Sequence, residues 1–250
     1  MSGHSHAHNV MIRKGKANNA RSKLFSKLTR EITVASKMGL PDPDHNARLR
    51  TAVIAARAQS VPKDVIERAI RKGQGNDAEN YDEVRYEGYG PGGIALIVEA
   101  LTDNRNRTAA DVRAAFSKFG GTLGEAGSVA FMFDRAGVIT YPLDKGTADE
   151  MLELALDAGA EECDTDENEH EFLTTPETFV AVRDALEKKL GTPATSGIFF
   201  RPQNAVAVDD GHGETLMKLI DALDDLDDVQ RVTGNYELSD ALLAKLDADD

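Results

Sequence analysis

Basic side chains are the residues of this sequence whose types and spacing could most clearly do chemistry. Four of them stand at helical spacing within residues 19–38, namely Lys23, Lys27, Arg30 and Lys37. If this segment is a helix, the four lie within an arc of about 80°, because successive residues turn by about 100°. Such an arc of ammonium and guanidinium groups can contact the phosphates of a nucleic acid. The alternative interpretation is an ordinary solvated helix face.

Other basic residues flank this segment, and few carboxylates stand near enough in the sequence to pair with them. The further candidates for phosphate contact are Arg13, Lys14, Lys16, Arg48, Arg50, Arg71 and Lys72. Residues 1–75 carry 15 of the 29 Lys and Arg residues but only 5 of the 43 Asp and Glu residues, a formal charge of +10. The remainder carries −24 and brings the chain to −14. This asymmetry indicates polyanion binding at the basic end, although that end could instead dock on the acidic remainder.

A second candidate contact is the segment Thr102–Thr108, which follows an apolar run and contains Arg105 and Arg107. A strand-to-helix junction presents free backbone amides that attract anions. The alternative is ordinary capping of the helix.

The run Gly88–Gly93 is rich in glycine, but no Gly-Lys-Ser/Thr follows it, and the next element is a predicted strand rather than a helix. It therefore matches neither a P-loop nor a dinucleotide-binding turn. A tight turn between strands, in which glycines permit positive φ, is the favoured interpretation.

No set of residues supports catalysis or a resident cofactor. The sequence has no nucleophile-elbow or zinc-peptidase motif and no Cys/His set at zinc spacing. Cys163 stands beside acidic residues, which disfavour its thiolate. The leader contains His4, His6 and His8. If Met1 is removed, the new terminal amine, two amides and His4 could hold copper(II) or nickel(II), but a polar leader with incidental metal affinity is favoured. We therefore predict a protein that is not an enzyme and has no metal or cofactor.

The basic segment is expected to fold as three helices, the first over residues 19–38. Asp44 is the expected N-cap of the second helix, and Ser60 that of the third. From residue 81 onward, short apolar runs alternate with helical patterns, which indicates strands alternating with helices. One of the expected strands covers Val129–Phe133.

This order of elements predicts an α+β multidomain fold: an N-terminal three-helix basic domain and two ferredoxin-like α/β domains, one inserted in the other. The predicted boundaries are 1–75 for the helical domain, 81–135 with 202–240 for the discontinuous α/β domain, and 136–201 for the inserted one. Two consecutive domains with a break near residue 135 are the alternative.

Composition also indicates the cellular compartment of the protein. No apolar run is long enough to cross a bilayer, and no secretory signal opens the sequence. A single cysteine fits a reducing compartment. We expect a cytoplasmic protein without a membrane partner.

Eight short motifs between residues 3 and 130 point to a known family, and the resemblance itself covers essentially the whole chain. They are Gly3–Ser5, Lys27–Ala35, Asp42–Asp44, Pro62–Asp64, Ile66–Ile70, Tyr86–Gly93, Thr102–Thr108 and Gly127–Ala130. Each resembles the corresponding run of the YebC family, and matches of this length are highly specific.

The resemblance implies a basic helical bundle and two α/β domains around a central cleft. Family members are generally described as probable transcriptional regulatory proteins that bind DNA, and mitochondrial relatives resemble translational activators of cytochrome c oxidase that act on ribosomes. This chain departs from the family where His6 and Ala7 replace the usual lysine and tryptophan. The leader therefore lacks the tryptophan on which a base could stack, whereas Arg13 and Lys14 keep the electrostatic contact.

The leading hypothesis is a non-enzymatic, DNA-binding transcriptional regulatory protein. The alternative is a ribosome-associated translational activator that binds structured RNA. Phosphate contacts carry no base information, and no recognition-helix signature is evident, so the sequence separates the two poorly. A protein–protein adaptor acting through the acidic part is a third class, and the sequence predicts no oligomeric state.

Overall fold

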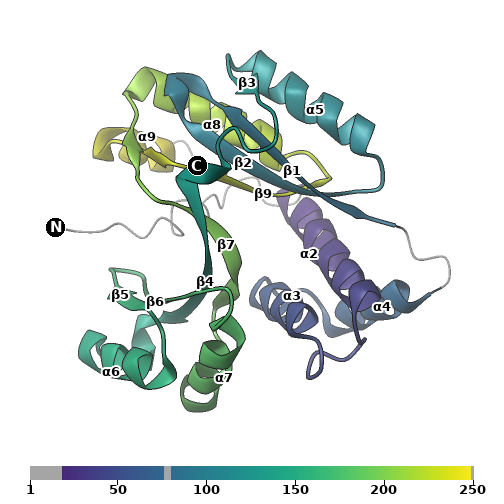
Figure 1. The fold of residues 1–250 in the computed structure, drawn as a ribbon, viewed down its shortest axis with the longest axis vertical. Coiled ribbons are helices and arrows are strands. Elements are labelled where there is room, and N and C mark those ends of the chain that lie inside the picture. Colours follow the sequence, from purple (N-terminus) through teal and green to yellow (C-terminus); the bar gives the residue numbers. More distant parts are fainter. Residues whose placement is uncertain (1–18, 76–79, 249–250) are drawn as a thin grey trace. The chain divides into compact units, whose positions relative to one another are not determined.

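The computed structural model describes residues 19–75 and 80–248 of the chain (Figure 1). These residues form two compact units, one of residues 28–75 and 135–199 and the other of residues 19–27, 80–134 and 200–248. The predicted contacts Arg13, Lys14 and Lys16 and the histidine leader lie outside the described residues. No helix within the described ranges has the length and apolarity needed to span a membrane.

The N-terminal region is helical, as predicted. Its helices are α2 (Asn19–Met38), α3 (Ala47–Ala58) and α4 (Lys63–Gln74). The first coincides with the segment expected from the spacing of apolar residues, and Ile32 in its middle is fully buried.

The expected caps of the other two helices are wrong. Asn46, rather than Asp44, caps α3: its side chain accepts a hydrogen bond of 3.0 Å from the Leu49 amide. Ser60 adopts a positive φ of 59° in the preceding turn, and Pro62 occupies the cap position of α4. Several residues in these turns are of types that cap helices, and the local backbone path decides which one reaches the free amides.

One antiparallel sheet lies in the second unit, with the strand order β3-β1-β2-β9. Its strands are β1 (Asp82–Tyr89), β2 (Ala95–Thr102), β3 (Thr122–Leu123) and β9 (Val229–Gly234). Helices α5 (Arg105–Lys118) and α8 (Asp210–Asp224) bury Phe116 and Leu219 against Leu96 of β2 and its neighbours. A short parallel pair and a last helix complete this region: β8 (Val206–Ala207), β10 (Tyr236–Glu237) and α9 (Asp240–Ala248).

Strands β1 and β2 form a hairpin across the glycine-rich run, which confirms the predicted turn. A one-turn 3₁₀ helix, Pro91–Gly93, closes the hairpin, and Gly92 and Gly93 both adopt a φ of +73°. Because β1 precedes β2, this sheet is built in the chain order β-β-α-β, followed after the second sheet by α-β.

The other antiparallel sheet has the strand order β5-β6-β4-β7. Its strands are β4 (Phe133–Pro142), β5 (Glu162–Thr165), β6 (Glu169–Thr174) and β7 (Thr195–Pro202). With α6 (Ala148–Ala158) and α7 (Phe179–Leu190), they follow the β-α-β-β-α-β order expected for residues 136–201. Phe172 and Leu186 are fully buried in the core between sheet and helices.

The strand expected over Val129–Phe133 is wrong. Residues Ala130–Met132 form a short 3₁₀ helix instead, and the strand β4 begins only at Phe133. Apolar periodicity cannot distinguish a short strand from an apolar turn that is buried for another reason.

The fold class is therefore α+β, with an N-terminal helical region and two antiparallel sheets, as the sequence predicted. The division into three domains with the boundaries given above stays a prediction.

Candidate nucleic-acid interface

Helices α2 and α4 are in close contact because Gly73 has no side chain. A Cβ at Gly73 would lie 2.5 Å from the carbonyl oxygen of Thr33, which no real side chain could occupy. Two hydroxyls of α2 then reach α4: Ser36 donates to the Ile70 carbonyl at 2.8 Å, and Thr33 donates to the Ala69 carbonyl at 3.2 Å. The ends of the two helices are thereby held side by side.

This contact brings together three of the predicted phosphate contacts. Lys37 stands in the last turn of α2, and its backbone nitrogen would lie 3.1 Å from a Cβ at Gly73. Arg71 and Lys72 directly precede Gly73 in the last turn of α4. All three side chains are exposed, and we call them the crossing cations. Basic residues at helix C-termini also offset the helix dipole, so their location stabilises the helices as well.

Two other predicted contacts are held by acidic residues at the end of α8 and just after it, one through a carboxylate and one through a backbone carbonyl. We call residues Asp224–Asp228 the acidic turn. Lys23 forms an ion pair of 3.0 Å with Asp225, and the Lys27 amine donates to the Asp224 carbonyl at 2.6 Å. Burial lowers the pKa of Lys27 in spite of the nearby carboxylates. For this part of the basic arc, the structure shows docking on acidic residues.

Arg48 and Arg50 of α3 are paired as well. Arg48 binds Glu31 of α2 with two contacts, of 2.7 Å and 3.2 Å. Arg50 lies 2.6 Å from Glu187 and 3.6 Å from Asp184, both on α7. Arg48 and Arg50 therefore stabilise the packing of helices, and a phosphate would have to compete with their carboxylate partners. Arg30 of α2, another predicted contact, is half-buried.

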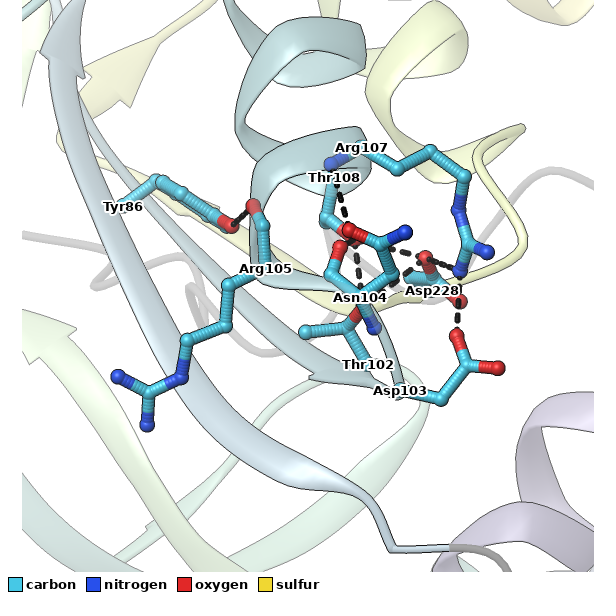
Figure 2. A network of polar contacts seen from close by, with 8 residues as sticks. All are labelled: Tyr86, Thr102, Asp103, Asn104, Arg105, Arg107, Thr108 and Asp228. Atoms are coloured by element: carbon cyan, nitrogen blue, oxygen red, sulfur yellow. Dashed lines mark hydrogen bonds and ion pairs between the residues drawn. The ribbon is translucent and has the colours of Figure 1, made fainter.

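The two arginines after β2 have different surroundings: Figure 2 shows Arg107 in a compact polar network, whereas the side chain of Arg105 points away from it. Arg105 binds Asp82 at 2.8 Å. Arg107 binds Asp103 at 2.7 Å and Asp228 at 2.6 Å. Asn104 caps α5 by accepting a hydrogen bond of 3.1 Å from the Arg107 amide. The geometry is that of a capped helix whose arginines already have carboxylate partners.

Asp228 is the centre of this network, as Figure 2 shows. Its buried carboxylate accepts hydrogen bonds from Thr108 at 2.7 Å and Thr102 at 3.3 Å, besides its ion pair with Arg107. The hydrogen bond to Asp228 is also the main reason why the pKa of Arg107 is raised. The sequence offered no signal for this role, because four aspartates in a run of five residues look like a solvated surface.

Glu87 is a second residue that sequence reasoning missed. Its side chain has no exposed surface, yet it accepts hydrogen bonds from the amides of Val129 (2.9 Å) and Ala130 (2.8 Å) and pairs with Arg85 (2.9 Å). Burial would raise the pKa of Glu87, but the amides and Arg85 outweigh it and hold the pKa below its ordinary value. Its contacts explain the short 3₁₀ helix found where a strand was expected.

Cys163 behaves as the sequence indicates. It is half-buried, and burial, with a smaller effect of Asp164, raises the pKa of its thiol to about 11. A thiol of this kind is protonated at neutral pH and is a poor nucleophile.

The regions that hold these cations match known sequence families along most of the chain. Residues 5–76 match the TACO1/YebC protein N-terminal domain, and residues 81–236 match Transcrip_reg, the TACO1/YebC second and third domain. The chain belongs to the TACO1/YebC family. The resemblance found in the sequence motifs is thereby confirmed.

A solved structure supports the same conclusion for the fold. The crystal structure of a conserved hypothetical protein, Aq1575 from Aquifex aeolicus, is 43% identical in sequence and superimposes with a TM-score of 0.82. The similarity covers 92% of this chain and 96% of that chain. The TACO1/YebC fold therefore extends over both helical and sheet regions of this protein.

Proposed function

We propose that this TACO1/YebC protein is a non-enzymatic, DNA-binding regulator of transcription that contacts phosphates through the crossing cations. The observation that carries the proposal is the location of Lys37, Arg71 and Lys72 at the exposed ends of two helices fixed against each other. Six of the other predicted contacts bind acidic residues of the chain, namely Lys23, Lys27, Arg48, Arg50, Arg105 and Arg107. Cations on a rigid support lose little freedom when a polyanion binds, which favours affinity.

Structured RNA is the second candidate ligand, in keeping with a ribosome-associated translational activator. RNA is favoured because the two ends of α2 differ in charge. Acidic residues hold Lys23 near the start of the helix, and Lys37 lies about 21 Å further along it, at 1.5 Å per residue. A long straight duplex following α2 would meet the acidic turn, whose residues Asp225 and Asp224 hold Lys23 and Lys27. A folded RNA can present several phosphates to the crossing cations alone, without approaching the acidic turn.

The test compares the wild-type protein with Lys37→Gln/Arg71→Gln/Lys72→Gln in binding to a DNA duplex and to an RNA hairpin. If all three cations contact phosphates, the plot of log affinity against log salt should be shallower by up to ~2.7 for duplex DNA. The control, Lys145→Gln/Lys188→Gln/Lys218→Gln, removes the same charge from exposed lysines elsewhere and should leave the slope unchanged.

Equal losses in both variants would contradict the proposed interface, and absence of binding to either polymer by the wild-type protein would contradict the function. Crosslinking in cells separates the two ligands, since promoter DNA should be recovered with a transcriptional regulator and ribosomal RNA with a translation factor.

A further inference from the structure

Helix α6 has one face in the core and one apolar face outside it. Met151 and Ala155 are buried, with exposed fractions of 1% and 3%, and pack against the second sheet. Leu152 and Leu156 are instead 49% and 73% exposed. Residues four apart share one side of a helix, so the two leucines form a continuous apolar stripe.

Acidic residues surround this stripe. Residues 143–170 contain eleven carboxylates and one basic residue, Lys145, a formal charge of −10. On α6 itself, Asp149, Glu153 and Asp157 are exposed and fall with the two leucines within an arc of about 140°. Only Asp157 among these three has a basic partner in the described structure, Lys189 at 3.2 Å. The stripe therefore lies in a strongly negative field.

The neighbouring edge strand extends the negative surface. Strand β5 is at the edge of its sheet and is adjacent to α6. Along β5, Cys163 packs toward the core, while Glu162 and Asp164 alternate with it and are exposed. Charged side chains on an edge strand discourage its pairing with another strand, which leaves α6 as the docking element.

We propose that the outer face of α6, formed by Leu152 and Leu156 with Asp149, Glu153 and Asp157, is a docking surface for a basic amphipathic segment of a partner protein. The leucines supply apolar contact, and the carboxylates match lysine and arginine side chains beside it. A charge of −10 repels nucleic acid. Among the residues that the structure describes, no group of acidic side chains is arranged to hold a metal ion.

The test uses the full chain and a labelled 18-residue peptide of leucine and lysine with leucines at helical spacing. A second peptide keeps the lysines and replaces each leucine by serine. The first peptide should bind at least tenfold more tightly than the second. Leu152→Ser/Leu156→Ser should weaken binding of the first peptide at least tenfold, whereas Met38→Ser/Leu40→Ser, a change at an exposed apolar pair elsewhere on the chain, should not.

Equal binding of the two peptides, or an unchanged affinity in Leu152→Ser/Leu156→Ser, would overturn the proposal. Asp149→Asn/Glu153→Gln provides a variant that keeps both leucines and should weaken binding severalfold, most at low salt. Sedimentation of the protein alone tests whether a second copy of the chain covers the leucine stripe. If the wild-type chain dimerises and the leucine variant is monomeric, a second copy covers the stripe and the proposal of a separate partner is wrong.

Discussion

The end of the α2–α4 pair and the start of α5 both carry basic residues that the sequence marks as phosphate contacts, yet their surroundings differ. Lys37, Arg71 and Lys72 are exposed on helix ends, whereas Arg105 and Arg107 are bound to carboxylates. The difference shows that charge alone does not identify a binding surface. The exposure of a cation and the support beneath it also decide how readily a phosphate can reach it.

The largest expected effect is on the network that engages Arg107. Asp228→Asn should lower the free energy of unfolding by about 2–3 kcal/mol, because the ion pair and two hydrogen bonds from buried threonines lose their charged acceptor. Urea unfolding measures the change. Asp103→Asn, which removes only the half-exposed partner of Arg107, should cost less than about 1 kcal/mol. Similar losses would show that Asp228 is no more structural than a surface carboxylate.

Glu87→Gln should lower the free energy of unfolding by about 2 kcal/mol at neutral pH, since amides of the 3₁₀ turn lose a charged acceptor. The folded pKa of Glu87 is below its ordinary value of 4.5, so its contribution is present above that value and is lost as pH falls through the folded pKa. Acidification from pH 6 to pH 3 should therefore destabilise the wild-type protein more than the variant. Parallel pH profiles would contradict this assignment.

Removing the carboxylates beside the first half of α2 should make that half, like the second, more open to phosphate contact. Asp224→Asn/Asp225→Asn should raise affinity for a DNA duplex up to about tenfold and steepen the log-salt slope by up to ~0.9, because Lys23 loses its ion pair with Asp225. Lys27 keeps its acceptor, which is the backbone carbonyl of residue 224. Asp228 is left intact, so stability should change by less than about 1 kcal/mol. Asp111→Asn/Asp144→Asn removes the same charge elsewhere and serves as the control. If the acidic turn also excludes straight duplex, affinity for the RNA hairpin should rise less.

The smallest effect is expected at Arg105. Its ion pair with Asp82 is exposed at both ends, with side chains 64% and 57% accessible. Arg105→Gln should therefore change stability by less than about 1 kcal/mol and leave the log-salt slope of nucleic-acid binding unchanged. A slope reduced by about 0.9 would place a phosphate on Arg105 and make the two regions more alike than their contacts indicate.

Much of the fold followed from local patterns. The apolar spacing of residues 19–38 predicted α2 with its observed bounds, and the glycine-rich run predicted the β1–β2 turn. Errors arose where several residues of similar propensity compete, as with Asp44 and Asn46 before α3. At residues 129–133 the deciding influence was Glu87, more than forty residues away, which no local pattern contains.

The sequence by itself determined the family, the α+β class and the separation of a basic N-terminal segment from an acidic remainder, because these depend on composition and on periodicities within short windows. Only the tertiary structure decided which cations have partners. Lys23 meets Asp225 across 202 residues, Arg50 meets Glu187 across 137, and Arg107 meets Asp228 across 121. An ion pair depends on distances of a few ångströms, and packing of helices and sheets brings such residues together wherever they stand in the chain.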